Sequence, residues 1–191
     1  MNRTQIQQLQ SRVGTTPDSF WGPKSIAACQ AHLRSLMPSP NPWPKPDQAR
    51  LRAYYGAPGD ESNLVTIEFS YPMFYEGKLC RTTRVHKRCA DSLLRVLTAI
   101  GRGFGSNQDI MDEADDYGGL FNFRLKQGGT SYSLHAYGAA IDLDADDNGF
   151  YDHWPMKADM DIEIMECFAR EGWKSAGAFW GYDAMHHEAT S

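Results

Sequence analysis

Two short segments of this chain place histidines and carboxylates at spacings that suit a metal site. Residues 133–142 contain His135 and Asp142, and residues 183–186 begin with Asp183 and end with His186. Three such nitrogen and oxygen ligands with an open fourth position make a catalytic zinc site. The remaining carboxylate can then transfer protons beside a bound water. For either segment alone, the alternative is a polar strand end that carries histidines by chance.

The residues around these side chains indicate how the chain positions them. The apolar residues Ala139, Ala140, Ile141 and Leu143 around Asp142 are typical of a buried strand. We therefore expect His135 on the turn that enters the strand and Asp142 near the end of the strand. Ser133 is placed to donate a hydrogen bond that orients a ligand. The offset of three residues puts Asp183 and His186 on one side of a turn or short helix.

The two segments resemble motifs of the zinc D,D-peptidase and L-alanyl-D-glutamate endopeptidase family, which is related in fold to D-alanyl-D-alanine carboxypeptidases and to the hedgehog signalling domain. The family pattern Ser-x-His-x-x-Gly-x-Ala-x-Asp is matched by Ser133, His135, Gly138, Ala140 and Asp142. The second pattern, Trp-Gly-x-Asp-x-Met-His-Phe-Glu, is matched at all but the Phe position by Trp180, Gly181, Asp183, Met185, His186 and Glu188.

The resemblance implies one zinc ion per chain on His135, Asp142 and His186, with Asp183 as the general base. His187 stands where the family has Phe, so two neighbouring histidines are candidates for the third ligand. We prefer His186 because it keeps the three-residue offset from Asp183.

Arg124 follows an aromatic-rich stretch upstream of the first motif, where the resembled family carries an arginine. A fixed guanidinium can stabilise the negative charge that develops on a carbonyl oxygen during amide hydrolysis, or hold a substrate carboxylate. The alternative is a surface arginine in a salt bridge. Beside Arg124, we expect three further residues in or near the motifs to contact the substrate: Ser133, Tyr137 and Trp180.

An acidic loop overlaps the end of the first motif. Asp144, Asp146, Asn148 and Asp152 match the opening of a calcium-binding loop. The twelfth position, where a bidentate Glu belongs, is Pro155. Acidic turns with Asn-Gly are common without a metal, so we favour a plain turn and keep calcium as the alternative.

Composition limits the classes of function. The net charge of −5 and the lack of a basic run argue against nucleic-acid binding. There is no long apolar segment that suggests a membrane span and no hydrophobic signal core near Met1. We therefore expect a monomer made in the cytoplasm without a secretory signal peptide.

The four cysteines are scattered and suggest reduced core residues, with a Cys80–Cys89 disulfide kept as an alternative.

The chain divides at a segment in which proline alternates almost strictly. We assign residues 1–37 to a small all-α module, 38–49 to a proline-rich linker and 50–191 to a catalytic domain. In the module, one apolar stripe ends at Gly14 and a second helix begins at Pro23. The small helical peptidoglycan-binding module is resembled by this segment at Leu9-Gln10, Gly14, Pro17-Asp18, Phe20-Trp21-Gly22-Pro23 and Ser25. The alternative is a helical hairpin that packs on the catalytic domain.

The catalytic domain mixes strands and helices without a βαβ alternation. Residues 64–69 alternate like a half-buried strand. Apolar residues from Val85 to Ile100 predict an amphipathic helix that ends near Gly101 and Gly103. Asp159 is a suitable N-cap for a later helix that stops at Gly172. We predict an α+β fold, with a small, mainly antiparallel sheet and flanking helices that hold the zinc site.

The resemblance implies a peptidoglycan hydrolase that cleaves the stem peptide with a zinc-activated water, similar to a bacteriophage endolysin. Such a protein is made in the host cytoplasm and acts on the cell wall or periplasm after release through a holin lesion. The L-alanyl-D-glutamate bond is the preferred site of cleavage. The alternatives are a D-alanyl-D-alanine carboxypeptidase and a non-catalytic, zinc-containing wall-binding protein.

Overall fold

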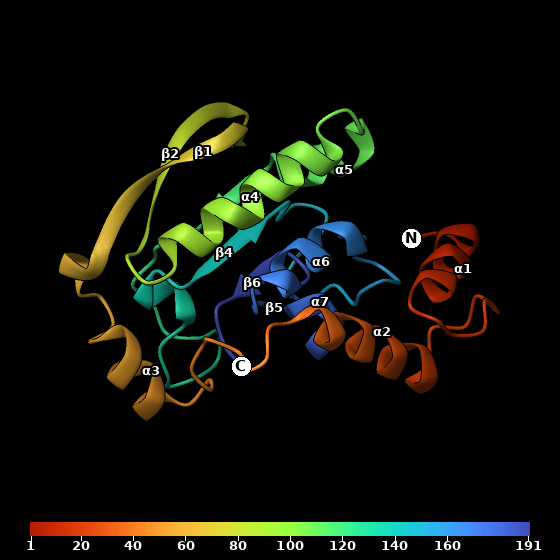
Figure 1. The fold of residues 1–191 in the computed structure, drawn as a ribbon, viewed down its shortest axis with the longest axis horizontal. Helices are drawn as coiled ribbons and strands as arrows, with labels where there is room; N and C mark the ends of the chain where they lie inside the picture. Colours follow the sequence, from red (N-terminus) through yellow and green to blue (C-terminus); the bar gives the residue numbers. More distant parts are fainter.

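Seven α-helices and two antiparallel sheets make up the computed structural model, which describes residues 1–191; the hairpin of β1 and β2 lies at its periphery (Figure 1). The α+β prediction is confirmed. No helix combines the length and the apolarity that crossing a bilayer requires. In chain order the elements are α1 (Arg3–Arg12), α2 (Pro23–Leu36), α3 (Gln48–Tyr55), η1 (Glu61–Asn63), β1 (Leu64–Tyr75), β2 (Lys78–His86), α4 (Ala90–Phe104), α5 (Gln108–Ala114), β3 (Tyr117–Gly119), η2 (Leu134–Tyr137), β4 (Ala140–Leu143), α6 (Ile162–Arg170), β5 (Lys174–Ser175), α7 (Ala176–Trp180) and β6 (His186–Glu188).

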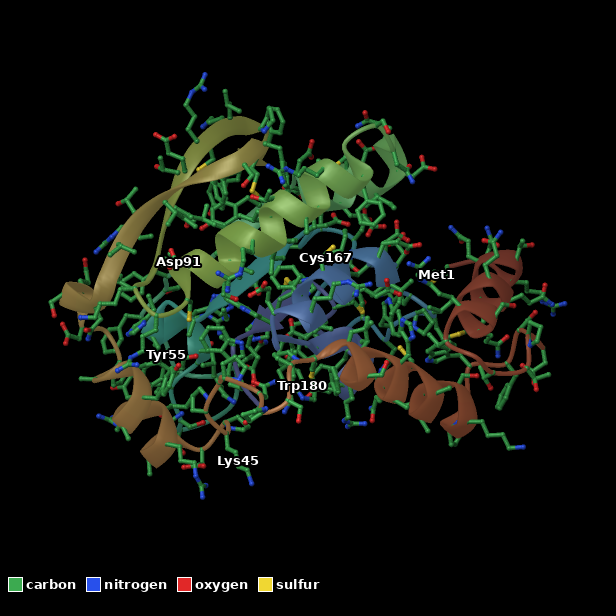
Figure 2. The ribbon with its side chains drawn as sticks, in the orientation of Figure 1. Met1, Lys45, Tyr55, Asp91, Cys167 and Trp180 are labelled. Carbon is green, nitrogen blue, oxygen red and sulfur yellow. The ribbon has the colours of Figure 1, made fainter.

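The small four-stranded sheet has the order β3-β4-β6-β5. Strand β4 pairs with β6 in a register that sets Asp142 opposite His186, so the two motifs meet across neighbouring strands. Helices α4 and α6 contribute fully buried apolar side chains to the core beside this sheet: Leu93, Val96, Leu97, Ile100, Ile164, Met165 and Phe168. Figure 2 shows the side chains that fill the space between these elements.

Strands β1 and β2 form a separate long hairpin. The predicted strand at residues 64–69 is confirmed and continues to Tyr75. Glu76 and Gly77 both have positive φ, 47° and 71°, as a two-residue hairpin turn with the right twist requires. The hairpin packs against α4 and also contacts β3, so one end of it lies near the small sheet.

Two helix boundaries differ from the sequence-based expectations. Val85 lies near the end of β2, and the amphipathic helix α4 begins only at Ala90. Its end at Phe104 agrees with the prediction near Gly101 and Gly103, although Gly101 itself lies inside the helix. A Cβ at Gly101 would lie 2.9 Å from the ring of Tyr71, so this glycine serves close packing rather than the end of the helix. The later helix, α6, has Asp161 as its N-cap instead of Asp159.

Helices α1 and α2 form where the sequence predicts them, and Pro23 is the first residue of α2. Their buried side chains Leu9, Cys29 and Leu33 belong to the same core as the rest of the chain. Arg12 forms ion pairs with Glu163 and Glu166 on α6 at 2.6 and 2.7 Å. The proline-rich segment is also anchored, because Trp43 Nε1 donates to the carbonyl of Glu171 at 2.8 Å. The proposed domain boundaries stay a prediction, and the helices pack on the remainder of the chain.

All four cysteines are unpaired, so the Cys80–Cys89 bridge is not formed. Cys29, Cys89 and Cys167 are buried, and burial raises the pKa of the Cys89 thiol to about 12. These thiols therefore stay protonated and pack as apolar side chains.

Candidate metal centre

His135, Asp142 and His186 meet at the junction of η2, β4 and β6. The His135 Nε2 atom lies 3.1 Å from Asp142 Oδ1 and 3.1 Å from His186 Nδ1. The distance between His186 Nδ1 and Asp142 Oδ1 is 3.0 Å. The three potential ligand atoms thus form a nearly equilateral triangle whose members come from three different elements.

This triangle fits a metal ion. Ligands about 2.0–2.1 Å from a tetrahedral zinc ion lie roughly 3.3–3.4 Å from one another, and the observed separations are only slightly shorter. Two imidazole nitrogens and one carboxylate oxygen are also a common donor set for catalytic zinc. Both imidazoles are buried, whereas Asp142 is partly accessible. The two histidine ligands are therefore held in the protein interior, whereas the cluster can be reached from the side of Asp142.

A hydrogen bond from its other nitrogen fixes the imidazole of His135. The Nδ1–H donates to the carbonyl oxygen of Leu120 at 2.6 Å, which leaves the lone pair of Nε2 facing the cluster. Ser133 supports this arrangement in a way that differs from the prediction. Its Oγ accepts a hydrogen bond from the backbone N–H of His135 at 3.3 Å, so it caps η2 and does not donate to a ligand side chain.

Glu188 holds His186 in the matching orientation. The His186 Nε2 lies 3.3 Å from Glu188 Oε2, and Thr190 Oγ1 donates to the other Glu188 oxygen at 2.6 Å. A proton on Nε2 therefore points to Glu188, and Nδ1 is free to bind a metal. Burial opposes ionisation of Glu188, but the hydrogen bond and charge of His186 together with the hydrogen bond from Thr190 lower its carboxyl pKa. Glu188 belongs to the second sequence motif, but the sequence did not indicate that it orients His186. This positioning role follows only from the contact in the structure.

Electrostatics favour a charged cluster. Burial opposes ionisation of Asp142, yet the two imidazoles beside it hold its pKa below the usual range. Burial likewise disfavours the charged form of His186, but Asp142 and Glu188 raise its pKa to about 10. In the absence of metal the pair His186 and Asp142 is therefore ionic, and a bound cation would replace the proton.

His187 points away from the cluster. Adjacent residues on a strand face opposite sides of the sheet, and the His187 ring stacks on Phe168 with a centroid distance of 4.0 Å. Its Nδ1 shares a hydrogen bond with Ser175 Oγ at 2.7 Å. Burial lowers the pKa of His187 to about 3. The structure thus places His186, and not His187, beside His135 and Asp142.

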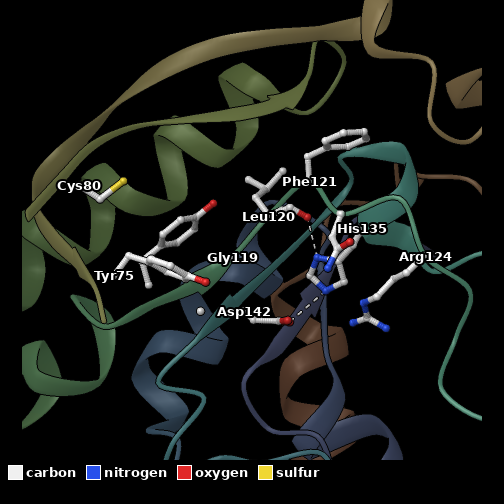
Figure 3. A pocket seen from close by; sticks show the side chains of 11 residues that line it. Tyr75, Cys80, Gly119, Leu120, Phe121, Arg124, His135 and Asp142 are labelled. Atoms are coloured by element: carbon white, nitrogen blue, oxygen red, sulfur yellow. Dashed lines mark hydrogen bonds and ion pairs between the residues drawn. The ribbon is translucent and has the colours of Figure 1, made fainter. Parts of the chain in front are cut away.

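Asp183 and Arg124 line the cavity next to the cluster. Asp183 is buried and adopts a φ of 60°, a left-handed conformation that is uncommon outside glycine. Burial raises the pKa of its carboxyl, although the nearby His186 partly offsets this. Arg124 is exposed and forms no ion pair; its guanidinium points toward Asp142 and His135 in Figure 3. The salt-bridge alternative for Arg124 is therefore not observed.

Two cavities flank the cluster and share Arg124 and Asp142 as lining residues. The hairpin-side cavity, about 350 Å³, is bounded by Tyr75, Cys80 and Tyr117 (Figure 3). The Trp180-side cavity, about 370 Å³, holds a different set of side chains that includes Lys126, Ser133, Phe150, Trp180, Tyr182 and Asp183. Sequence reasoning missed the hairpin-side cavity, because the wall formed by Tyr75, Cys80 and Tyr117 comes from residues far from either motif.

The predicted substrate contacts differ in their positions. Trp180 is 40% exposed, and its ring centroid lies 5.8 Å from that of His186. Tyr137 is buried and lines neither cavity; its hydroxyl donates to Gln48 at 3.1 Å. Trp180 therefore lies at the site, whereas Tyr137 lies apart from it although it is only two residues from His135 in the sequence.

The acidic loop is held together by its own hydrogen bonds. The amide oxygen of Asn148 accepts from the backbone N–H groups of Asp159 and Met160 at 3.1 and 2.8 Å. The Asn148 amide group also donates to Asp144 at 2.9 Å, and Lys157 pairs with Asp152. Since both lone pairs of the Asn148 oxygen are used, this residue has none left for calcium. The contacts weigh against the calcium alternative.

Comparison with known proteins agrees with the geometry. Residues 127–189 match the model of a family described as D-alanyl-D-alanine carboxypeptidase. The match supports membership of that zinc peptidase family. The matched segment contains the three cluster residues and Asp183, but neither Arg124 nor the N-terminal helices. No curated protein and no solved structure matches the chain.

Proposed function

We propose that the protein is a zinc metallopeptidase that hydrolyses the stem peptide of bacterial peptidoglycan. The observation that carries this proposal is the His135–Asp142–His186 cluster, which fits a metal, within a segment that matches a zinc peptidase family. The cavities on both sides of the cluster offer room for a peptide. Within this proposal, His135, Asp142 and His186 would hold one zinc ion per chain.

A bound zinc ion supplies Lewis acidity, which lowers the pKa of a water to roughly 7 and polarises a substrate carbonyl. Asp183 would accept a proton from that water on its carboxylate and then deliver it to the leaving amine. A raised carboxyl pKa suits this exchange, because it moves the carboxyl pKa toward neutral pH. Arg124, which is unpaired at the edge of both cavities, would stabilise the negative charge on the carbonyl oxygen.

The L-alanyl-D-glutamate bond remains our preferred site of cleavage. A bond inside the stem peptide has chain on both sides, and the two cavities around the cluster can accommodate both parts. A D,D-carboxypeptidase needs room for only one residue beyond the bond. The family description favours this second activity, and Arg124 would then bind the terminal carboxylate.

We propose that this activity serves lysis of the bacterial wall, as in an endolysin. A non-catalytic wall-binding protein would need the cluster but not a buried carboxylate at Asp183, whose left-handed backbone conformation carries an energetic cost. The two roles differ in their effect on a turbid suspension of permeabilised cells. A hydrolase clears the suspension, whereas a wall-binding protein leaves it turbid.

Mass spectrometry of digested peptidoglycan tests the proposed bond. New fragments that begin with D-Glu or isoglutamine are expected from the purified, zinc-loaded protein. Loss of a single terminal D-Ala would instead establish the carboxypeptidase alternative. Asp183→Asn serves as the control for contaminating hydrolases, and intact peptidoglycan after treatment with the wild-type protein would refute both activities.

A further inference from the structure

A third cavity lies at the seam between the N-terminal helices and the rest of the chain. This seam cavity has a volume of about 320 Å³, at the lower end of the range for small-ligand pockets, roughly 300–1,000 Å³. Helix α2 contacts α7 here, and the two lie side by side in Figure 1. The side chains that form the cavity are Trp21, Ile26, His153, Trp154, Met156 and Trp180.

Large apolar side chains converge on this cavity while staying open to solvent. Ile26 is 40% exposed, Met156 59% and Trp180 40%. Single exposed apolar residues are common, but several around one cavity mark an interaction site. The floor is rigid, because the rings of Trp21 and Trp154 meet edge to face at 5.3 Å and Trp154 Nε1 donates to the carbonyl of Met160 at 2.9 Å.

The seam cavity also carries a polar group. His153 is exposed, and its Nδ1 is hydrogen-bonded to the carbonyl of Gly181 at 3.1 Å. Its Nε2 has no hydrogen-bond partner in the protein and is available to a ligand. An aromatic surface with a few polar groups at its edge is suited to a sugar, whose ring has apolar C–H faces and hydroxyl groups at its rim.

Trp180 connects the seam cavity with the candidate metal centre. The same side chain lines the Trp180-side cavity, together with Asp183 and His186. A ligand can therefore extend from the cluster past Trp180 into the seam. One end of such a ligand would contact the charged groups of the cluster, and the other end would contact the aromatic rings of the seam cavity.

We propose that the seam cavity binds the N-acetylated amino-sugar chain to which the stem peptide is attached. This inference rests on the proposed function. The stem peptide is joined to the sugar through its first residue, L-alanine, so the L-alanyl-D-glutamate bond lies one residue from the sugar. One extended residue spans about 3.3–3.6 Å. Cleavage at this bond therefore requires a place for the sugar close to the reacting groups, and the seam beyond Trp180 provides it. A terminal D-alanine lies several residues farther along the stem.

The N-terminal helices gain a specific role from this assignment. Ile26 on α2 and Trp21 just before α2 both line the seam cavity, so the N-terminal segment would contribute part of the substrate site itself. Docking of this segment through Arg12 to α6 keeps those side chains in place.

The test compares the double variant Ile26→Ser/Met156→Ser with Val65→Ser in the full-length protein. Val65 is a matched control, because it is 39% exposed and lies on β1 away from the cavity. Binding of a peptide-free oligomer of N-acetylated amino sugars is followed by tryptophan fluorescence. Hydrolysis is measured on a free stem peptide and on the same peptide linked to its disaccharide.

We expect wild type and Val65→Ser to bind the sugar oligomer and to prefer the disaccharide-linked peptide. The double variant should bind the oligomer about five- to tenfold more weakly and lose that preference by a similar factor, since apolar contact area is removed. Equal binding by all three proteins, or no binding by wild type, would overturn the proposal even if both peptides are cleaved. Sugar binding without hydrolysis of either peptide would refute the proposed function and leave the sugar site standing. Loss of a dimer in the double variant, with sugar binding unchanged, would assign the seam to a second copy instead.

Discussion

Replacing Glu188 by Gln tests whether this buried residue tunes the metal centre. In the wild type, the ionised carboxylate accepts a hydrogen bond from His186 Nε2–H and leaves Nδ1 to face the cluster. Gln has nearly the same shape and can still accept this hydrogen bond, and the hydroxyl of Thr190 can rotate to accept from its amide. The variant therefore removes the charge while it preserves the packing.

The magnitude follows from that loss of charge. A hydrogen bond to a charged group contributes about 1.5–3 kcal/mol, compared with about 0.5–1.5 kcal/mol for a neutral one. The difference of about 1–1.5 kcal/mol corresponds to about five- to tenfold weaker zinc binding. This lies at the lower end of the range of about 10–100-fold found for partners of metal-binding histidines.

Zinc affinity is measured by competition with a chelating dye at constant pH, and thermal unfolding of the metal-free proteins verifies the fold. Glu68→Gln provides the control, because Glu68 is exposed on β1 and forms no ion pair. An unchanged zinc affinity in Glu188→Gln would refute the positioning role. An equal loss in Glu68→Gln would show that net charge alone explains the effect.

Three further predictions concern other residues of the molecule. Asp183→Asn should keep one zinc per chain by elemental analysis but lose about 100-fold or more in kcat, the scale of general acid–base catalysis; near-normal turnover would move that role elsewhere. His187→Phe should keep the zinc content as well, because His187 faces Phe168 on the other side of β6, and loss of metal would contradict this placement. Burial and the neighbouring Asp161 raise the pKa of Glu113 to about 9, above its unfolded value. The folded state therefore binds this proton more tightly than the unfolded state does. As a result, the folded state loses stability as the pH rises from about 4.5 to 9. Glu113→Gln should therefore be about 1–3 kcal/mol more stable than wild type near pH 8 and similar near pH 4, as chemical denaturation at both pH values can measure.

The sequence predicted the ligands better than their surroundings. His135, Asp142 and His186 lie in short motifs whose spacing reflects local geometry, and the structure brings them together. The partners that orient them could not be predicted, because the Leu120 carbonyl and the Glu188 carboxylate reach the imidazoles only through tertiary packing. The hairpin-side cavity was missed for the same reason.

Helix boundaries show a second limit of sequence patterns. Val85 and Cys89 are four residues apart and both fully buried, which mimics a helical repeat although Val85 ends strand β2. Gly101 and Gly103 indicated the end of α4 near Phe104, but Gly101 itself lies inside the helix, where Tyr71 packs closely against it. A periodic pattern records which side chains are buried, but it does not distinguish two elements that bury residues in the same core.

The cluster joins parts of the chain that are distant in sequence, since His135 and His186 are 51 residues apart. An ion held between η2, β4 and β6 would act as a removable cross-link. Each tenfold increase of free zinc above the dissociation constant would add about 1.4 kcal/mol to the stability of the folded state. Proteases cut chains mainly through transient open states. The survival of this protein among proteases would therefore follow the supply of zinc in its surroundings, so that the same ion would govern both how fast the protein works and how long it lasts.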